Sequence, residues 1–177
     1  QAMFQAVSIS TTAGFATTDF AAWPVFLPIL LIFASFIGGC AGSTGGGLKV
    51  IRIFLLFLQG KREINRLIHP KAVYSVKLGE RAMPDRVVEA VWGFFAAYAI
   101  VFVIIMLALL GTGMDDITAF TATAATLNNL GPGLGEVSGT YASVSDGGKW
   151  ILVLAMLFGR LEVFSLLVLF SPTFWRS

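Results

Sequence analysis

The stretch SFIGGCAGSTGGGLKVIRIF (residues 35–54) interrupts an otherwise apolar segment that is suited to a membrane-spanning helix. Six of its residues are glycine, and Ser43 and Thr44 add hydroxyl groups near its centre. Glycine adopts backbone conformations that other residues avoid, and it weakens a helix that contains it. We therefore expect two half-helices, over residues 22–38 and 48–58, joined by a flexible non-helical break at membrane depth.

The composition of the chain indicates which solvent surrounds it. Hydrophobic residues make up 56% of the sequence and charged residues only 12%, and the mean hydropathy is +0.83. A soluble domain needs roughly twice that share of charge to cover its surface. The sequence therefore predicts an integral membrane protein. Its single cysteine, Cys40, excludes an internal disulfide. The opening QAMFQAVSIS does not resemble a signal peptide, so we expect a fragment of a longer chain.

Two further segments are long enough to cross a bilayer. Residues 87–110 would extend about 36 Å as a helix, more than the roughly 30 Å hydrocarbon core, and residues 150–170 are of similar length. Seven of the twelve Lys and Arg residues fall within residues 61–86, so the positive-inside rule places this loop and the C-terminus in the cytoplasm. Topology and lipid contact explain this basic run, and docking of a cytosolic partner is the alternative.

The two remaining linkers, which this topology places outside the cell, share a pattern. They contain FQAVSISTTAGFATTDF (residues 4–20) and AFTATAATLNNLGPGLGEV (residues 119–137). In each, a helix-compatible run that is too short to span leads to polar residues and then to a glycine, Gly14 or Gly131. When these glycines are aligned, Thr12 falls on Asn129. The alternative for each turn alone is an ordinary external loop, but two such turns in register favour a repeated element.

Asp115 and Asp116 precede the second short run, where carboxylates cap free amides and complement the positive end of a helix dipole. They predict a helix that starts near Ile117, and metal binding is the less favoured alternative. The C-terminal end of this helix, its negative pole, would face the following turn. Such an end suits a cation rather than an anion.

A short helix and turn between spanning helices form a re-entrant loop. Non-helical backbone is tolerated at membrane depth only when it is buried in protein or lines a water-filled cavity. Extended backbone carbonyls can there replace the hydration shell of an ion, and glycine permits the required conformation. The order span, re-entrant loop, span is complete over residues 87–170 and lacks its first span over residues 1–58. We therefore expect an internal repeat.

Four motifs carry a resemblance to a known family: STTAGF (10–15), GGCAGSTGGGLK (38–49), TLNNLGPGLG (126–135) and GRLEVF (159–164). They are similar to the C-terminal part of the Trk/Ktr/HKT superfamily of potassium transporters. That superfamily is built from four covalently linked helix, pore-loop, helix repeats around a pseudo-fourfold pore. The resemblance covers essentially the whole chain and implies an all-α integral membrane fold with a potassium-channel-like pore.

The resemblance divides the chain into three parts. Residues 1–60 would hold the pore loop and broken second helix of a third repeat. Residues 61–86 would form the basic cytoplasmic loop. Residues 87–177 would be the complete fourth repeat, with helix, pore loop and helix.

The resemblance also implies the residues of a selectivity filter. The central potassium ligands would be the main-chain carbonyls of Thr12 and Ala13 in the third strand and of Asn129 and Leu130 in the fourth. The other filter positions would be Thr11, Gly14, Phe15, Asn128, Gly131 and Pro132. The fourth strand has Asn where a Thr-Val-Gly filter has Thr, and Pro after the glycine, so it departs from strict fourfold coordination.

The glycine-rich break is expected to act as an intramembrane gate, formed by Gly38, Gly39, Gly42, Ser43, Thr44, Gly45, Gly46 and Gly47. Its GSTGGGLKV superficially resembles a phosphate-binding loop, but Lys49 is not followed by Ser or Thr. Arg160 lies near the middle of the last span, where a charge costs at least about 2.5 kcal/mol unless it faces water or a partner. The family places an arginine of its last helix below the filter. The alternatives for Arg160 are a pair with Glu162 and an interfacial position.

The sequence thus predicts part of a pore for potassium uptake, not an enzyme, with K⁺ as the transported ion and no cofactor. The resemblance implies missing N-terminal repeats in the same polypeptide, a homodimer, a cytosolic nucleotide-binding regulatory subunit and the bacterial inner membrane, without nucleic acid. One alternative is a secondary transporter with a solute site at a broken helix, which inverted repeats would indicate. The other is a noncatalytic membrane scaffold, which would not need paired filter-like turns.

Overall fold

The computed structural model describes residues 1–161, except residues 25, 41, 44 and 73. The described part is almost entirely helical and contains one small hairpin. Its helices are α1 (Ala2–Ser10), α2 (Phe26–Ile37), α3 (Val50–Ile68), α4 (Asp85–Leu110), α5 (Asp116–Leu127) and α6 (Asp146–Arg160). Two 3₁₀ turns, η1 (Phe20–Ala22) and η2 (Gly135–Val137), and the antiparallel strands β1 (Lys77–Leu78) and β2 (Arg81–Ala82) complete it.

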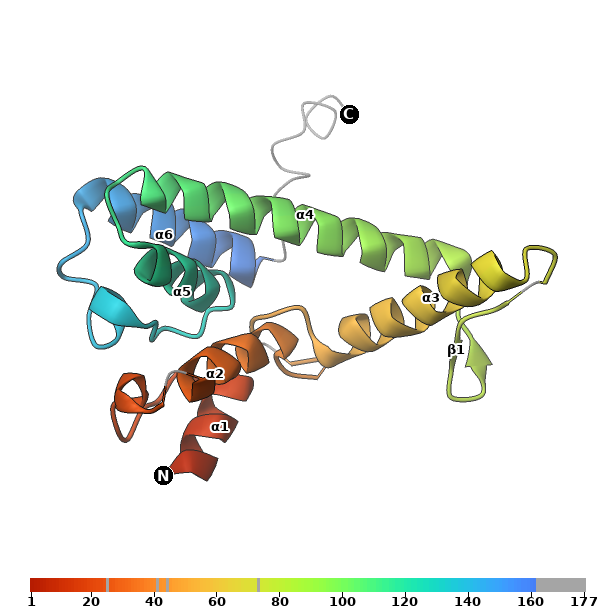
Figure 1. Ribbon diagram of the computed structural model, residues 1–177, viewed down its shortest axis with the longest axis horizontal. Coiled ribbons are helices and arrows are strands. Elements are labelled where there is room, and N and C mark those ends of the chain that lie inside the picture. The colour runs from red at the N-terminus through yellow and green to blue at the C-terminus, as the bar shows by residue number, and fades with distance from the viewer. Residues whose placement is uncertain (25, 41, 44, 73, 162–177) are drawn as a thin grey trace.

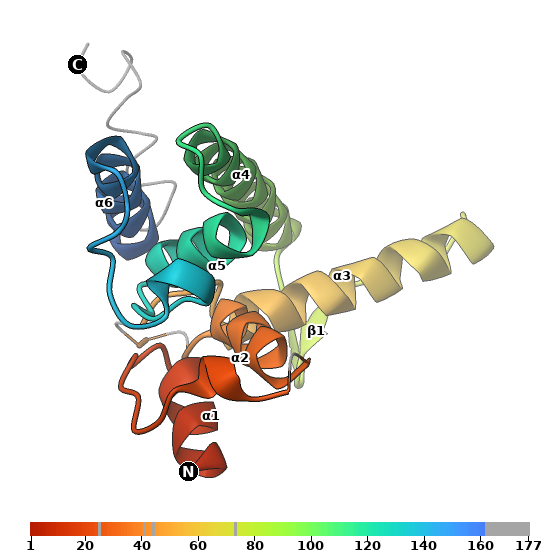
Figure 2. The same cartoon turned by 60° about the vertical axis from the view of Figure 1, so that its left-hand side comes forward.

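The helices form two groups that meet at α5. Helix α5 packs between α4 and α6 and also contacts α2 on its other side (Figure 2). Helix α1 packs against α2, and α3 leads away from this group alongside the first half of α4 towards the hairpin (Figure 1). The repeated order of short helix, turn and longer helix is therefore seen twice, as α1 then α2 and as α5 then α6.

One described helix is long and apolar enough to cross a membrane, namely α4 with 26 residues and a mean hydropathy of 2.7 in its most apolar window. Only 22% of that window is buried, and Ile100, Ile104 and Leu107 are each more than half exposed. Such exposure suits contact with lipid. Helix α2 is apolar but shorter, and the predicted span over residues 150–170 continues beyond the described residues after α6.

The predicted break between two half-helices is present. Helix α2 ends at Ile37 and α3 begins at Val50. Gly38 and Gly47 have left-handed backbones, with φ of 65° and 80°, so glycine is needed at both ends of the break. Two backbone bonds hold its ends together: the amide of Leu48 donates to the carbonyl of Phe36 at 2.9 Å, and that of Val50 donates to Gly39 at 3.2 Å.

The basic segment 61–86, which we predicted to be a cytoplasmic loop, contains regular secondary structure. Helix α3 continues to Ile68, and the hairpin of β1 and β2 follows it. The expectation relied on charge, but Lys, Arg and Glu are good helix formers, and the chain has no proline here before Pro70. The Arg62 guanidinium, which contacts the Asp85 carboxylate at 2.5 Å, also ties the end of α3 to the start of α4.

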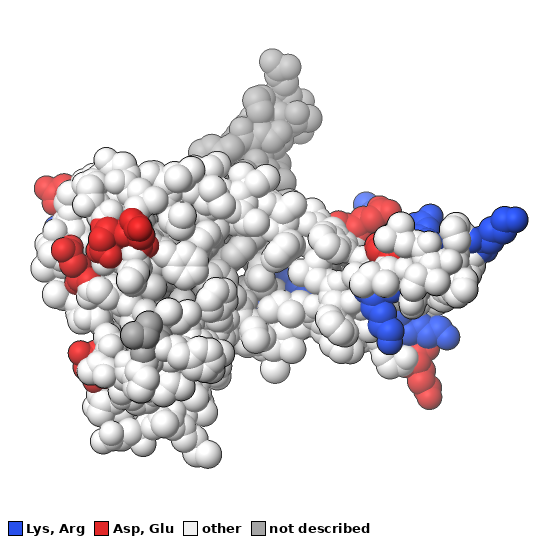
Figure 3. Space-filling model, viewed as in Figure 1, with Lys and Arg blue, Asp and Glu red and all other residues white. Residues whose placement is uncertain are grey.

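Charged side chains gather at the two ends of the molecule. On the face shown in Figure 3, Lys and Arg lie mostly over α3 and the hairpin together with some acidic residues, and the opposite end carries mainly acidic residues. The surface between them carries almost no charge. This distribution matches a protein whose middle is embedded in lipid and whose ends are wet.

Candidate functional site

The turns after α1 and α5 have the same backbone hydrogen bonds in the same register. After α1, the amides of residues 11, 12, 13 and 14 donate to the carbonyls of residues 7, 9, 8 and 8 at 3.0, 3.1, 2.8 and 3.4 Å. After α5, the amides of residues 128, 129, 130 and 131 donate to the carbonyls of residues 124, 126, 125 and 125 at 3.0, 3.1, 2.7 and 3.4 Å. The alignment of Gly14 with Gly131 is therefore a structural equivalence.

Both turns also place the same two positions in the left-handed region. Thr12 and Asn129 have φ of 57° and 53°, and Gly14 and Gly131 have φ of 76° and 103°. The glycines were expected to be necessary for the geometry of the turns. The left-handed Thr12 was not expected, because a β-branched residue rarely adopts positive φ. Strained backbone of this kind persists only where the surrounding structure holds it, and it is common at functional sites.

The two turns lie against each other. A Cβ added to Gly14 would come within 2.0 Å of the carbonyl oxygen of Leu130, so only glycine fits at this contact. Hydroxyl groups bind a carbonyl in each turn: Ser8 donates to the oxygen of Phe15 at 2.6 Å, and Tyr141 donates to that of Gly131 at 2.6 Å. Tyr141, in the linker before α6, has no counterpart in the sequence pattern and was missed by it.

The predicted filter residues differ in their surroundings. Asn128 is fully buried, with its side chain bonded to other side chains, whereas Thr11 is exposed. The remaining positions include both exposed and buried residues. Exposed are Ala13, Phe15 and Gly131; buried are Thr12 and Leu130; partly exposed are Gly14, Asn129 and Pro132.

The glycine-rich break packs directly against both turns. The amide of Gly46 donates to the Thr12 hydroxyl at 3.0 Å, and a Cβ on Gly46 would lie 1.7 Å from the carbonyl oxygen of Asn128. A Cβ on Gly45 would lie 3.1 Å from the Thr12 hydroxyl oxygen. In contrast, a Cβ on Gly42 would meet nothing within 4 Å. The structure thus brings the predicted gate and the predicted filter into contact; Thr44 lies outside the described residues.

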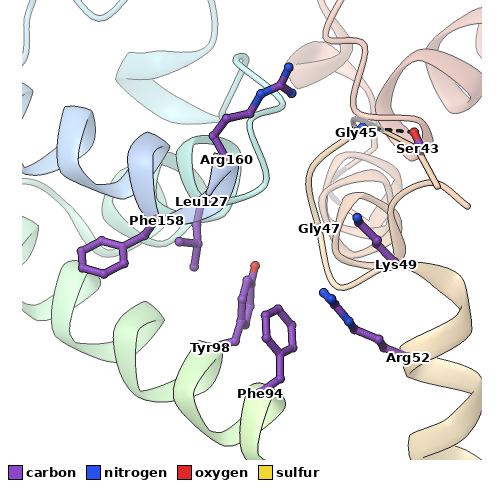
Figure 4. Close-up of a pocket in the computed structure, with 11 residues that line it drawn as sticks. Ser43, Gly45, Gly47, Lys49, Arg52, Phe94, Tyr98, Leu127, Phe158 and Arg160 are labelled. Atoms are coloured by element: carbon purple, nitrogen blue, oxygen red, sulfur yellow. Dashed lines mark hydrogen bonds between the residues drawn. The ribbon is translucent and has the colours of Figure 1, made fainter. Parts of the chain in front are cut away.

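A cavity of about 180 Å³ lies between the glycine-rich break, α4 and the end of α6. Arg160 lines it together with Ser43, the residue with which it aligns when the repeats are counted from Gly131 and Gly14. Two further residues line the cavity: Lys49, which directly precedes α3, and Arg52 in the first turn of α3. Figure 4 shows Arg160 on one side of the cavity and Lys49 and Arg52 on the other. Three cationic side chains therefore border one small space.

Lys49, Arg52, Phe94 and Tyr98 were missed as cavity residues by the sequence analysis. The Arg52 guanidinium lies over the ring of Phe94, 4.2 Å from its centroid, as in a cation–π contact. One feature of the sequence could have indicated a role for Arg52: like Arg160, it is a charged residue within an apolar stretch. Glu162, the suggested partner of Arg160, lies outside the described residues.

The two short helices point their C-terminal ends at the turns. Each such end is the partial negative pole of its helix dipole, which favours a cation nearby. At the other end of α5, Asp115 caps the helix by accepting from the amide of Thr118 at 3.1 Å. Hydrogen bonds from the Thr118 hydroxyl and then from its amide lower the pKa of Asp115. The predicted cap is confirmed, with α5 starting at Asp116.

These features define a class: an α-helical membrane protein built from units of helix, pore loop and helix. A family model described as "TrkH: Cation transport protein" matches residues 1–177. The chain therefore belongs to this family of cation transport proteins, and the resemblance found in its motifs is confirmed.

Several proteins are similar to the chain along its whole length. It is 69% identical over 177 residues to the Trk system potassium uptake protein TrkH of Vibrio parahaemolyticus and 66% identical to that of Escherichia coli, covering 36% and 37% of their lengths. It is 44% identical over 174 residues to TrkG of Escherichia coli, covering 98% of the chain and 36% of that protein.

A solved structure shows the same fold. The crystal structure of the potassium transporter TrkH from Vibrio parahaemolyticus matches with a TM-score of 0.91 and 68% identity, over 98% of the chain and 37% of that structure. The chain thus spans little more than a third of the length of these relatives.

Proposed function

We propose that the chain forms part of the pore of a potassium uptake system. The two equivalent turns act as two of the strands of a selectivity filter, and the carbonyls of Thr12, Ala13, Asn129 and Leu130 coordinate K⁺. The single observation that carries this proposal is the pattern of four backbone hydrogen bonds shared by the two turns, which meet at Gly14 and Leu130. The names of the relatives, potassium uptake proteins, agree with it.

A gate lies beneath this filter. The glycine-rich break, residues 38–47, closes the path below the turns and opens it by a change in backbone conformation, which glycine permits. Arg160, Lys49 and Arg52 border the cavity between the break and α4, where their positive charges raise the barrier for a cation. The contact of Gly46 with both turns supports a filter and a gate that act together.

The complete protein supplies what two repeats lack. A fourfold pore needs two further repeats from the same polypeptide, and the family resemblance adds a homodimer and a cytosolic nucleotide-binding regulatory subunit in the bacterial inner membrane. The basic end of α3 and the hairpin provide a surface for that subunit. A groove there is lined by Arg62, Arg66 and Lys71, together with the acidic Asp85 and Glu89.

The filter is tested by Gly131→Ser in the complete protein, with rubidium uptake measured in potassium-free and sodium-containing media. We expect a lower preference for K⁺ over Na⁺, because serine is strained at a φ of 103°. Gly139→Ser is the matched control, since Gly139 lies in open space in the external linker. A normal preference in Gly131→Ser would contradict the filter.

The gate is tested by deletion of residues 42–46 in the complete protein. We expect rubidium flux that no longer responds to the regulatory state of the cell, because the break can no longer close against the two turns. Unchanged flux together with unchanged regulation would contradict the gate.

A further inference from the structure

Three buried polar side chains form a hydrogen-bond chain behind the turn after α5. The Tyr98 hydroxyl of α4 donates to Oδ1 of Asn128 at 2.6 Å, and Nδ2 of Asn128 donates to Oγ of Ser35 in α2 at 2.9 Å. Asn128 and Ser35 are 0% exposed, and Tyr98 is 6% exposed. Three separate segments of the fold, α4, the end of α5 and α2, therefore meet in one polar contact within an apolar core.

The direction of each bond in this chain is determined. The Ser35 hydroxyl donates to the carbonyl of Ile32 at 2.6 Å, so it can only accept from Asn128. That fixes which side of the Asn128 amide faces Ser35 and leaves Oδ1 for the Tyr98 hydroxyl. Loss of either hydroxyl would leave a buried amide atom without a partner, which is costly in an apolar surrounding.

The hydrogen-bond chain reaches both the turn after α5 and the glycine-rich break. Asn128 directly precedes Asn129, whose left-handed φ of 53° shapes the turn, and the carbonyl of Asn128 lies against Gly46 of the break. Ser35 lies two residues before the end of α2, where the break begins. A shift of the amide of Asn128 would thus be felt by the turn and by the break.

The turn after α1 has no such chain among the described residues. Thr11, the counterpart of Asn128, is exposed, and its hydroxyl donates to the carbonyl of Val7 within α1 at 2.7 Å. Counting from the aligned glycines, Ser35 corresponds to the buried and apolar Leu152 of α6. The polar chain is therefore specific to the turn after α5.

We propose that Tyr98 and Ser35 are positioning residues for ion selectivity. Through Asn128 they hold the turn after α5 in the geometry that coordinates K⁺, and they couple it to the glycine-rich break. This inference rests on the proposed role of the turns as a filter. Without either hydroxyl the turn relaxes, and Na⁺ is accommodated more readily while the pore still conducts.

The test uses Tyr98→Phe and Ser35→Ala in the complete protein. Tyr98→Phe keeps the ring contacts to Phe36 and Phe94, whose centroids lie 6.3 and 6.4 Å away, and removes only the hydroxyl. Each variant should lower the ratio of rubidium to sodium uptake about fivefold, which corresponds to about 1 kcal/mol. The double variant should resemble the worse single variant, because both hydroxyls act through the same amide.

Controls separate this role from general destabilisation. Tyr74→Phe and Ser143→Ala remove exposed hydroxyls and should leave the uptake ratio unchanged. Ser35→Thr keeps a hydroxyl and should restore most of the selectivity that Ser35→Ala loses. A merely structural role would lower thermal stability and the amount of protein in the membrane at a constant uptake ratio, and that result would overturn the inference.

Gly131→Ser distinguishes this inference from the proposed function. If Gly131→Ser alters selectivity while Tyr98→Phe and Ser35→Ala do not, the positioning role is wrong and the filter stands. If Gly131→Ser leaves selectivity normal, the filter assignment fails, and with it the basis of the positioning role.

Discussion

The turn around Gly14 and the turn around Gly131 share four backbone hydrogen bonds, but the helices that precede them are buried to very different extents. In α5 every residue from 118 to 127 except Phe120 is buried. In α1, Met3 is 83% exposed and Val7 is 58% exposed. The hydrogen bonds that the two turns share therefore do not depend on equal packing around the preceding helices.

The two turns also differ in what fixes them. The turn after α1 uses a local serine, Ser8, to hold the carbonyl of Phe15. The turn after α5 uses Tyr141 from the following linker and the buried amide of Asn128. In the first turn the hydroxyl that binds a turn carbonyl comes from the preceding helix, and in the second it comes from the following linker. Substitutions that affect the two turns unequally test this difference.

The largest effect is expected at Gly46, which contacts both turns. Gly46→Ala would place a Cβ 1.7 Å from the carbonyl oxygen of Asn128, so the break or the turn must move. We expect rubidium uptake by the complete protein to fall more than tenfold, since overpacking at a rigid backbone costs about 1–3 kcal/mol or more.

Gly42→Ala is the matched control, because a Cβ there meets nothing within 4 Å. It should leave uptake nearly normal. Equal losses in the two variants would mean that the freedom of the break, rather than its contact with the turns, is what matters.

The next largest effect is expected from substitution of the two aligned glycines, Gly14 and Gly131. Both have positive φ, so alanine should be strained by about 1–2 kcal/mol at either position. Gly14→Ala adds a clash with the carbonyl of Leu130, whereas a Cβ on Gly131 meets nothing in the described structure. We expect Gly14→Ala to lower the thermal midpoint and the potassium preference more than Gly131→Ala does. The opposite order would contradict the contact between the turns.

A smaller effect is expected from the hydroxyls that bind the turn carbonyls. Ser8→Ala and Tyr141→Phe each remove one hydrogen bond, worth about 1 kcal/mol. Burial raises the pKa of Tyr141 from 10.0 to about 12, so its hydroxyl remains a donor at neutral pH, and its contribution is lost only as the pH rises from about 10 through about 12. Thermal unfolding in detergent at pH 7 and pH 11 measures both effects.

Ser8→Ala should have the same effect at both pH values, because its hydroxyl does not titrate in this range. A pH-independent difference between Tyr141→Phe and the parent protein would contradict the burial of the Tyr141 hydroxyl, which is the cause of its raised pKa.

The smallest effect concerns the cap of α5. The bonds from Thr118 lower the pKa of the Asp115 carboxyl, so the charged cap stabilises the fold above the ordinary carboxyl range, and this contribution disappears as the pH falls through the lowered value. Asp115→Asn should therefore reduce the thermal midpoint slightly at pH 7, and this reduction should shrink as the pH is lowered below the ordinary carboxyl range. Asp146→Asn at the start of α6 is a control, because Ser145 caps that helix.

Local patterns in the sequence were sufficient to predict much of this site. The break after Ile37, the cap at Asp115 and the register of Gly14 with Gly131 each depend on residues close together in the chain. The continuation of α3 to Ile68 was not predicted, because the prediction for residues 61–86 relied on their charge although Lys, Arg and Glu favour a helix.

Contacts between distant segments could not be predicted in this way. Tyr98 and Ser35 reach Asn128 from α4 and α2, and nothing near them in the sequence indicates a shared partner. The same holds for Lys49 and Arg52, which border a cavity with Arg160 only after the repeats have packed. The contacts of such residues depend on tertiary packing, which short-range sequence patterns do not describe.

Cys40 lies exposed within the glycine-rich break and is the single cysteine of this chain. Its thiol is thus a built-in chemical reporter at the segment that we expect to move. In a complete protein from which any other cysteines have been removed, the rate of maleimide labelling would read the accessibility of the break directly. Comparison of the labelling rate with and without potassium would measure whether the break opens.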